Sequence, residues 1–221
     1  MRFFGITRVS NFIDNQLIQT FHYDMFHGLA ERAGKAHPND KLVFPNTESP
    51  SSLEISRTGR RVPDICQPSH HLVVSERYAT QLQTLPHLRI MPVTFKRLVD
   101  VDYEKGDMSW FKKWGGGDPL DLLRRLPDVP EFHRQIGSYY EVQSYRGCDI
   151  VDNYAQLLEV PIVARTPPMD ETRVIRLSRE MLEDYPILGY GTKILSERAF
   201  QILADGFDRD FFIIREYDLP A

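Results

Sequence analysis

The sequence has little of what would indicate a disulfide scaffold, a membrane span or a nucleic-acid surface. Only two of its 221 residues are cysteines, Cys66 and Cys148, which is typical of a reducing compartment. No apolar run approaches the roughly 18 residues that cross a bilayer, and the first residues lack a signal-peptide core. A net charge of -4 offers no broad positive field for a phosphate backbone. We therefore expect a cytoplasmic protein that contacts neither membranes nor nucleic acid directly.

Motifs with a known catalytic geometry are missing as well. The triple glycine at 115–117 lacks the Lys-Ser/Thr ending of a P-loop and the spacing of a dinucleotide site, and there is no Gly-x-Ser-x-Gly elbow. Cys66 and His70 could supply two metal ligands, but no second pair with zinc-site spacing accompanies them. We expect neither a metal nor a cofactor, while a triad assembled only in space stays open.

The sequence contains one pattern that occurs twice. The stretch "LVVSERYATQL" begins at residue 72, and "KILSERAFQIL" begins 121 positions later at residue 193. In each copy a short apolar run favours a strand, the serine can cap a helix, and the glutamate places negative charge in its first turn. Apolar residues at helical spacing follow both motifs, so each copy predicts a strand that leads into a capped helix.

Further strands are predicted around these two units. Residues 93–103 alternate between apolar and polar side chains, which indicates one buried face and hence an antiparallel sheet, with Pro92 at an edge or a bulge. Other strands are expected in "RFFGITR", "SYYEVQSYRGCDIV", "PIVART", "TRVIRLS" and "DFFIIREYD". Helices are expected over 24–35 and 118–126. The fold class is therefore α+β: a mixed, mainly antiparallel sheet with short helices packed on it and a possible duplication of a strand–helix–strand unit.

The length fits a single domain over 1–221, with a division into an N-terminal part at 1–60 and a second part at 61–221 as the alternative.

The segment "DMSWFKKWGGGD" contains both tryptophans of the chain within a polar, glycine-broken stretch. Exposed aromatic side chains beside charges are favoured protein–protein anchors, and acidic neighbours favour a basic partner surface. We expect partner-binding residues here, namely Asp102, Glu104, Asp107, Trp110, Phe111, Trp114, Asp118 and Asp121. The alternative is that the aromatic side chains pack back onto the sheet as a lid.

The stretches "HHLVVSERYATQLQTLPHLRIMPV", "YEVQSYRGCDIVDNYA" and "LSERAFQILADGFDRDFFIIREYDL" together resemble bacterial immunity proteins encoded beside polymorphic toxins. The resemblance covers about residues 68–217. It implies a non-enzyme that binds a cognate toxin, encoded by an adjacent gene, and covers its active site or holds it inactive. Many such toxins attack nucleic acid with a basic groove, for which the acidic segment at 102–121, together with Asp205 to Asp218, would be a suitable plug.

The alternative of another class is a small hydrolase or a nucleotide-modifying enzyme. Its site would be assembled from His70, His71, Asp100 and Asp102 near strand ends, where loops commonly carry catalysis. The oligomeric state and the chemistry of the toxin stay open.

Overall fold

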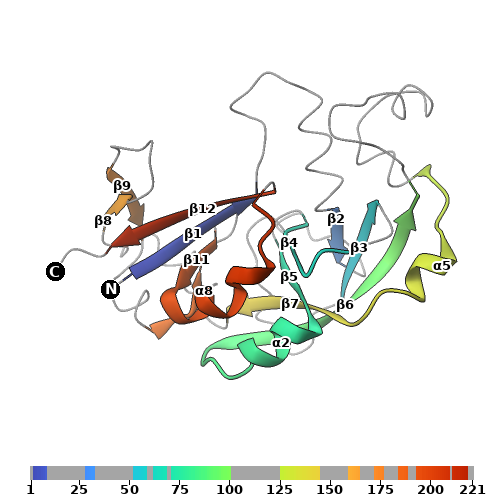
Figure 1. The fold of residues 1–221 in the computed structure, drawn as a ribbon, viewed down its shortest axis with the longest axis horizontal. Helices are drawn as coiled ribbons and strands as arrows, with labels where there is room; N and C mark the ends of the chain where they lie inside the picture. Colours follow the sequence, from blue (N-terminus) through green and yellow to red (C-terminus); the bar gives the residue numbers. More distant parts are fainter. Residues whose placement is uncertain are drawn as a thin grey trace, which may run out of the picture.

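A computed structural model describes residues 2–8, 28–32, 52–58, 62–68, 71–100, 125–144, 159–164, 172–176, 184–188, 193–209 and 211–218. The described elements form two six-stranded sheets with short helices between and beside them, which confirms the α+β class (Figure 1). All strand pairs in these sheets are antiparallel except one, the parallel pair β3–β6.

The first sheet has the strand order β4-β5-β7-β6-β3-β2. Its strands are β2 (Leu29–Arg32), β3 (Leu53–Thr58), β4 (Ile65–Cys66), β5 (Leu72–Ser75), β6 (Leu88–Val99) and β7 (Tyr139–Ser144).

The second sheet has the strand order β10-β11-β1-β12-β8-β9. Its strands are β1 (Arg2–Arg8), β8 (Glu159–Ala164), β9 (Thr172–Arg176), β10 (Ile187–Leu188), β11 (Lys193–Ser196) and β12 (Phe212–Asp218).

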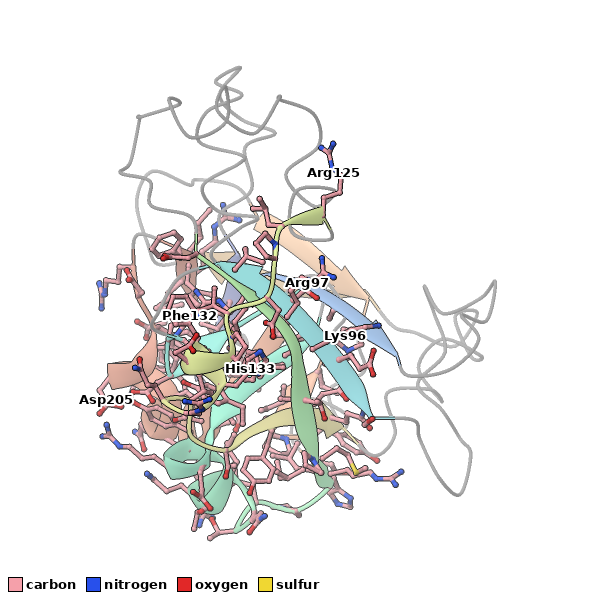
Figure 2. The ribbon with its side chains drawn as sticks, turned by 90° about the vertical axis from the view of Figure 1, so that its right-hand side faces the viewer. Lys96, Arg97, Arg125, Phe132, His133 and Asp205 are labelled. Carbon is pink, nitrogen blue, oxygen red and sulfur yellow. The ribbon has the colours of Figure 1, made fainter. Side chains whose placement is uncertain are left out.

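The described helical elements are few and short. They are α2 (Glu76–Leu82), α5 (Pro130–His133), α8 (Glu197–Leu203) and the 3-10 turn η2 (Ala204–Gly206). Helix α5 packs on β6. Figure 2 labels Phe132 and His133 of the helix and Lys96 and Arg97 of the strand. None of the helices in the described part of the chain is long and apolar enough to cross a membrane.

Four strands of one sheet correspond to four strands of the other, in the order β4-β5-β7-β6 and β10-β11-β1-β12. Ser75 is paired with Tyr139 of β7, and Ser196 is paired with Phe3 of β1. The backbone N–H of each serine donates to a carbonyl on the short neighbouring segment, at 2.8 Å for Asp64 and 2.9 Å for Pro186. The repeated sequence thus occupies equivalent places in two strand–helix–strand units, with helix α2 in one and α8 in the other.

The order of strands along the chain differs between the two units. In the first unit the central strand β7 follows β6, whereas in the second unit the central strand is β1, at residues 2–8. β1 lies between β11 and β12 and pairs with both. The second unit is therefore a permuted version of the first.

One hydrophobic core joins the two units. It contains Val74, Leu82 and Val142 from the first unit and Leu195, Leu203 and Phe212 from the second, all buried. A smaller cluster of Leu53, Ile55, Cys66, Val73 and Tyr139 covers the other face of the first sheet. Helices α2 and α8 lie side by side over the joint core (Figure 1).

The two serines occupy the predicted N-cap positions, but only one of them caps in full. The Ser196 hydroxyl accepts a hydrogen bond from the Ala199 backbone N–H at 3.3 Å. The Ser75 hydroxyl is buried and has no hydrogen-bond partner. The expected cap is confirmed for α8 and is wrong in its side-chain bond for α2. The N–H of Glu76, the first residue of α2, donates to the Ser138 carbonyl.

Pro92 lies where β6 changes neighbours. Residues Leu88 to Pro92 pair with β7, and the pairing with β3 begins at Val93. Pro92, which has no backbone N–H, therefore has a paired strand on one side only. The alternation of exposed and partly buried side chains from Pro92 to Arg97 is as predicted. The antiparallel pairing expected for this stretch is wrong, because Val93 to Val99 pair with β3 in parallel, and a half-buried face does not by itself fix the direction of the neighbouring strand.

The helix expected over 24–35 is wrong for its described part, because Leu29–Arg32 form the strand β2. β2 pairs with β3, and this tertiary pairing outweighs the local helical spacing. Gly28 precedes the strand with φ +81, and a Cβ there would lie 2.7 Å from the Ser56 carbonyl oxygen. The backbone at this point requires glycine. The helix expected over 118–126 lies mostly outside the described residues.

Candidate functional site

The two Ser-Glu-Arg units bring their helices together in an antiparallel pair. Arg77, near the start of α2, meets Asp205, which lies just beyond the end of α8. At the opposite end of the pair, Arg198, near the start of α8, lines a pocket together with Thr84, which lies just beyond the end of α2. The helix pair thus has two ends of related construction. We refer to them as the closed end, at Asp205, and the open end, at Thr84.

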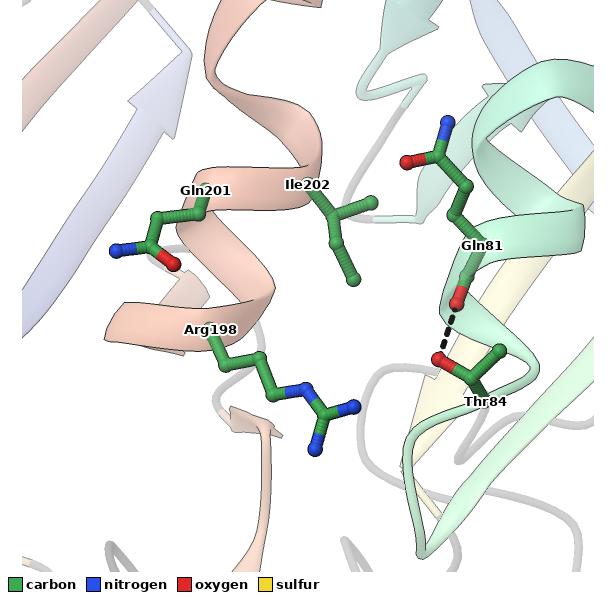
Figure 3. Close-up of a pocket in the computed structure, with 5 residues that line it drawn as sticks. All are labelled: Gln81, Thr84, Arg198, Gln201 and Ile202. Atoms are coloured by element: carbon green, nitrogen blue, oxygen red, sulfur yellow. Dashed lines mark hydrogen bonds between the residues drawn. The ribbon is translucent and has the colours of Figure 1, made fainter.

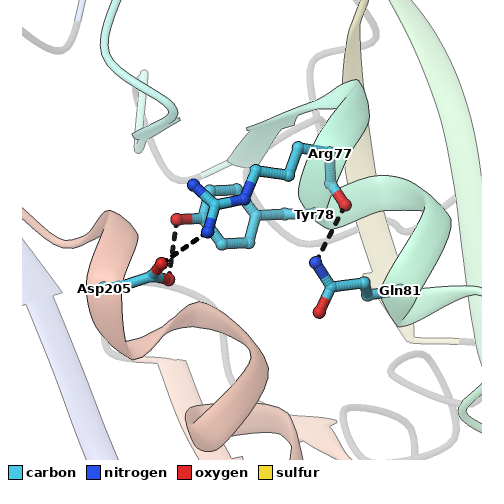
Figure 4. Close-up of polar contacts among 4 residues, drawn as sticks. All are labelled: Arg77, Tyr78, Gln81 and Asp205. Carbon is cyan, nitrogen blue, oxygen red and sulfur yellow. Dashed lines mark hydrogen bonds and ion pairs between the residues drawn. The ribbon is translucent and has the colours of Figure 1, made fainter.

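The closed end is a carboxylate held by two donors (Figure 4). Arg77 Nη2 donates to Asp205 Oδ2 at 2.6 Å, and the Tyr78 hydroxyl donates to Asp205 Oδ1 at 2.8 Å. The hydrogen bond from Tyr78 and the neighbouring Arg77 lower the pKa of the Asp205 carboxyl. Burial of Tyr78, together with that hydrogen bond, raises the pKa of its hydroxyl to about 12. At neutral pH the aspartate is therefore ionised and the tyrosine is a donor.

The open end is a pocket of about 370 Å³ between the helices (Figure 3). Its lining residues are Gln81, Thr84, Arg198, Gln201 and Ile202. Figure 3 shows the Arg198 and Ile202 side chains pointing into the space between α8 and α2. Ile202 is partly buried and the other four residues are exposed. The pocket therefore combines an apolar floor with one cation and amide groups, a combination suited to binding a polar side chain of a partner.

A second cluster of polar side chains, buried except for the partly exposed His71, lies where the two sheets approach each other. His71 Nδ1 and Glu141 Oε1 are joined by a hydrogen bond of 2.6 Å, and Gln143 Nε2 donates to Glu141 Oε2 at 2.7 Å. Burial lowers the pKa of Lys193 to about 8, while the charge of Glu141 acts in the opposite direction. Glu141 is 2% exposed and Lys193 is 5% exposed. Buried charges at such positions require partners, and these two interact from one sheet to the other.

Cys66 is not suited to act as a nucleophile. It is fully buried, and burial raises the pKa of its thiol to about 12. Because the thiolate is the reactive form, this cysteine is a small core side chain at neutral pH.

All eight residues expected to bind a partner lie outside the described residues: Asp102, Glu104, Asp107, Trp110, Phe111, Trp114, Asp118 and Asp121. The same holds for His70 and Asp102 of the enzymatic alternative. Its other two members are described and lie far apart. His71 adjoins Leu72, whose partner Val142 pairs with Ile90, whereas Asp100 follows β6 ten residues further on, a span of roughly 30 Å in an extended chain. The structure does not bring His71 and Asp100 together.

Among the described residues, no group of three or more His, Cys, Asp and Glu side chains is placed to hold a metal ion.

Sequence reasoning missed the pocket at the open end. Its signal was present in the repeat itself, because the arginine of each Ser-Glu-Arg motif projects from the first turn of a helix. What the sequence could not provide is the antiparallel pairing that places each arginine beside the end of the other helix.

Comparisons with protein-family models, curated proteins and solved structures found no match.

Proposed function

We propose that this protein is an immunity protein that binds a cognate toxin domain encoded by an adjacent gene and neutralises it by covering the toxin's active site. The observation that carries the proposal is the exposed face formed by α2 and α8. This face is built from the two Ser-Glu-Arg units on which the resemblance to immunity proteins rests, and it presents an open polar pocket.

The physical properties of this face suit a binding protein. Tyr78, Ala79 and Leu82 anchor α2 in the joint core, and Ala199 and Leu203 anchor α8. The exposed side chains therefore project from backbone that is already fixed, which lowers the entropy cost of binding. Arginine is enriched at protein interfaces, and the rims of such interfaces are polar.

The acidic and aromatic segment from Asp102 to Asp121 is the second part of the proposed interface. The net charge of -4 and the carboxylates of this segment favour a partner whose substrate groove is basic, as in a nuclease.

The test is co-expression with the protein encoded by the neighbouring gene. We expect that protein alone to stop growth, co-expression to restore growth, and the two purified proteins to form a stable complex on size-exclusion chromatography with light scattering. A neighbour that is harmless, or protection without any complex, would contradict the proposal.

The double variant Trp110→Ala/Trp114→Ala tests the segment separately. Because aromatic anchors dominate interface energies, we expect the Kd of the complex to rise at least about tenfold. An unchanged Kd would remove the segment from the interface and leave the function standing.

A further inference from the structure

The open and closed ends of the helix pair are related by the repeat. An offset of 121 positions carries Arg77 to Arg198 and Thr84 to Asp205. Each arginine therefore faces the position just beyond the end of the other helix. At the closed end that position holds a carboxylate, bound by Arg77 at 2.6 Å. At the open end it holds a threonine, and a pocket lies there instead.

We propose that the open end binds a carboxylate, supplied by a glutamate or aspartate side chain of the partner protein. The bound carboxylate would take the place that Asp205 has at the closed end, with Arg198 in the role of Arg77. The offset carries Tyr78 to Ala199, so the hydroxyl donor of the closed end has no counterpart here. That the partner is a toxin rests on the proposed function, whereas the chemistry of the pocket does not.

The charges around the helix pair support a carboxylate. Arg77 is paired with Asp205, and Arg2 of β1 is paired with Glu197 of α8. Within the described part of the chain, no carboxylate forms an ion pair with Arg198. A guanidinium binds a carboxylate through two parallel hydrogen bonds, which gives this pairing its directional preference.

The other lining groups suit the rest of an acidic side chain. Ile202, which the 121-position offset relates to Gln81 of α2, offers an apolar surface to its methylene groups. The Thr84 hydroxyl donates to the Gln81 carbonyl at 2.7 Å, so its hydrogen is already engaged and Arg198 is the principal donor. A volume of about 370 Å³ accommodates one side chain with its flanking backbone. A single arginine on a chain of net charge -4 does not favour a nucleic-acid phosphate.

The decisive variant is Thr84→Asp, which should supply the missing carboxylate from within the chain. Thr84→Asn is its uncharged control of the same shape. The readout is the Arg198 Nε–Hε resonance in NMR spectra of the full chain, titrated with the capped peptide acetyl-Leu-Glu-Leu-amide and with its glutamine counterpart.

We expect the wild type and Thr84→Asn to bind the glutamate peptide about fivefold more tightly than the glutamine peptide. In Thr84→Asp without peptide, the resonance should lie near its position in the saturated wild type, and the preference should be lost. Equal binding of the two peptides by the wild type would overturn the proposal. So would a preference for acetyl-Leu-Gln-Leu with a free C-terminus or for a phosphoserine peptide.

The protein of the neighbouring gene provides a second arm. Thr84→Asp and Arg198→Gln should each raise the Kd of its complex about fivefold or more, while Arg134→Gln, at an exposed arginine at the end of α5, should leave it within about twofold. A complex insensitive to Arg198→Gln would overturn the proposed partner contact. Absence of any complex, with the peptide preference intact, would overturn the toxin assignment alone.

Discussion

Leu72 and Lys193 stand at the same register position of the two units, the first opposite Val142 and the second opposite Ile6. Both side chains are buried. The substitution of a lysine for a leucine at an equivalent core position places a charge beside Glu141 of the other sheet, and the pair links the two sheets electrostatically. Such buried pairs are sensitive to the loss of either member.

The depressed pKa of Lys193 predicts a pH dependence of stability. The unfolded chain holds the lysine proton up to pH 10.5, whereas the folded chain releases it at about pH 8. The unfolded state thus binds more protons between these values, so the lysine makes the free energy of unfolding rise with pH in this window, by about 3 kcal/mol in total.

This contribution is measured as the difference between the wild type and Lys193→Met in urea unfolding at pH 7, 8, 9 and 10. The free energy of unfolding of the wild type should rise relative to that of the variant as the pH rises. Lys96→Met, at an exposed lysine paired with Glu54, should show no comparable change. A difference between wild type and Lys193→Met that is constant across this range would contradict the assigned pKa.

At the scale of elements, the contact between α2 and the η2 turn determines how the two units meet. Gly206 packs directly on the Tyr78 ring and on Ile65, and a Cβ at this position would lie 2.7 Å from the ring and 2.8 Å from Ile65 Cδ1. The atoms it would meet are buried, so they have little room to move. The same Tyr78 donates to Asp205 in the neighbouring turn position.

We therefore expect Gly206→Ala to lower the free energy of unfolding by about 1–2 kcal/mol, because overpacking outweighs the entropy gained from removing a glycine. Gly137→Ala is the matched control, since no atom lies within 4 Å of a Cβ placed there. That variant should be neutral or slightly stabilised. Chemical denaturation of both variants would measure the difference, and equal stabilities would contradict the close packing at Gly206.

The elements also show which parts of the fold could be predicted from sequence. The two Ser-Glu-Arg units and the strands β1, β7, β8, β9 and β12 were predicted because their local pattern and their tertiary environment agree. β2 was missed because its pairing with β3 is not local. Ser75 and Ser196 both begin a Ser-Glu-Arg motif, yet only Ser196 makes its side-chain cap bond, a difference that the shared motif does not contain. The open-end pocket depends on two segments 121 positions apart, and for that reason no local pattern revealed it.

At the scale of the whole molecule, the joint core makes the two units mutually dependent. Leu82 and Leu203, at equivalent positions of α2 and α8, are both fully buried in this one cluster. We predict that Leu82→Ala and Leu203→Ala each lower the free energy of unfolding by about 2–5 kcal/mol. Each variant should also unfold in a single transition.

Hydrogen exchange distinguishes cooperative unfolding of the two units from independent unfolding of each. In Leu82→Ala, the amides of β11 in the second sheet should lose protection together with those of β5 in the first. Unchanged protection of β11 would mean that the sheets open separately.

The position of β1 also bears on how the chain acquires its structure. Residues 2–8 find both of their neighbours only in β11 and β12, roughly 190 to 215 residues further along. At typical translation rates this separation corresponds to a wait of roughly ten to forty seconds. During that time Phe3, Phe4 and Ile6 have no sheet to enter, and pairings over such a distance form slowly. Until β11 and β12 have been synthesised, these apolar side chains stay exposed on the nascent chain, and we expect a chaperone to bind them.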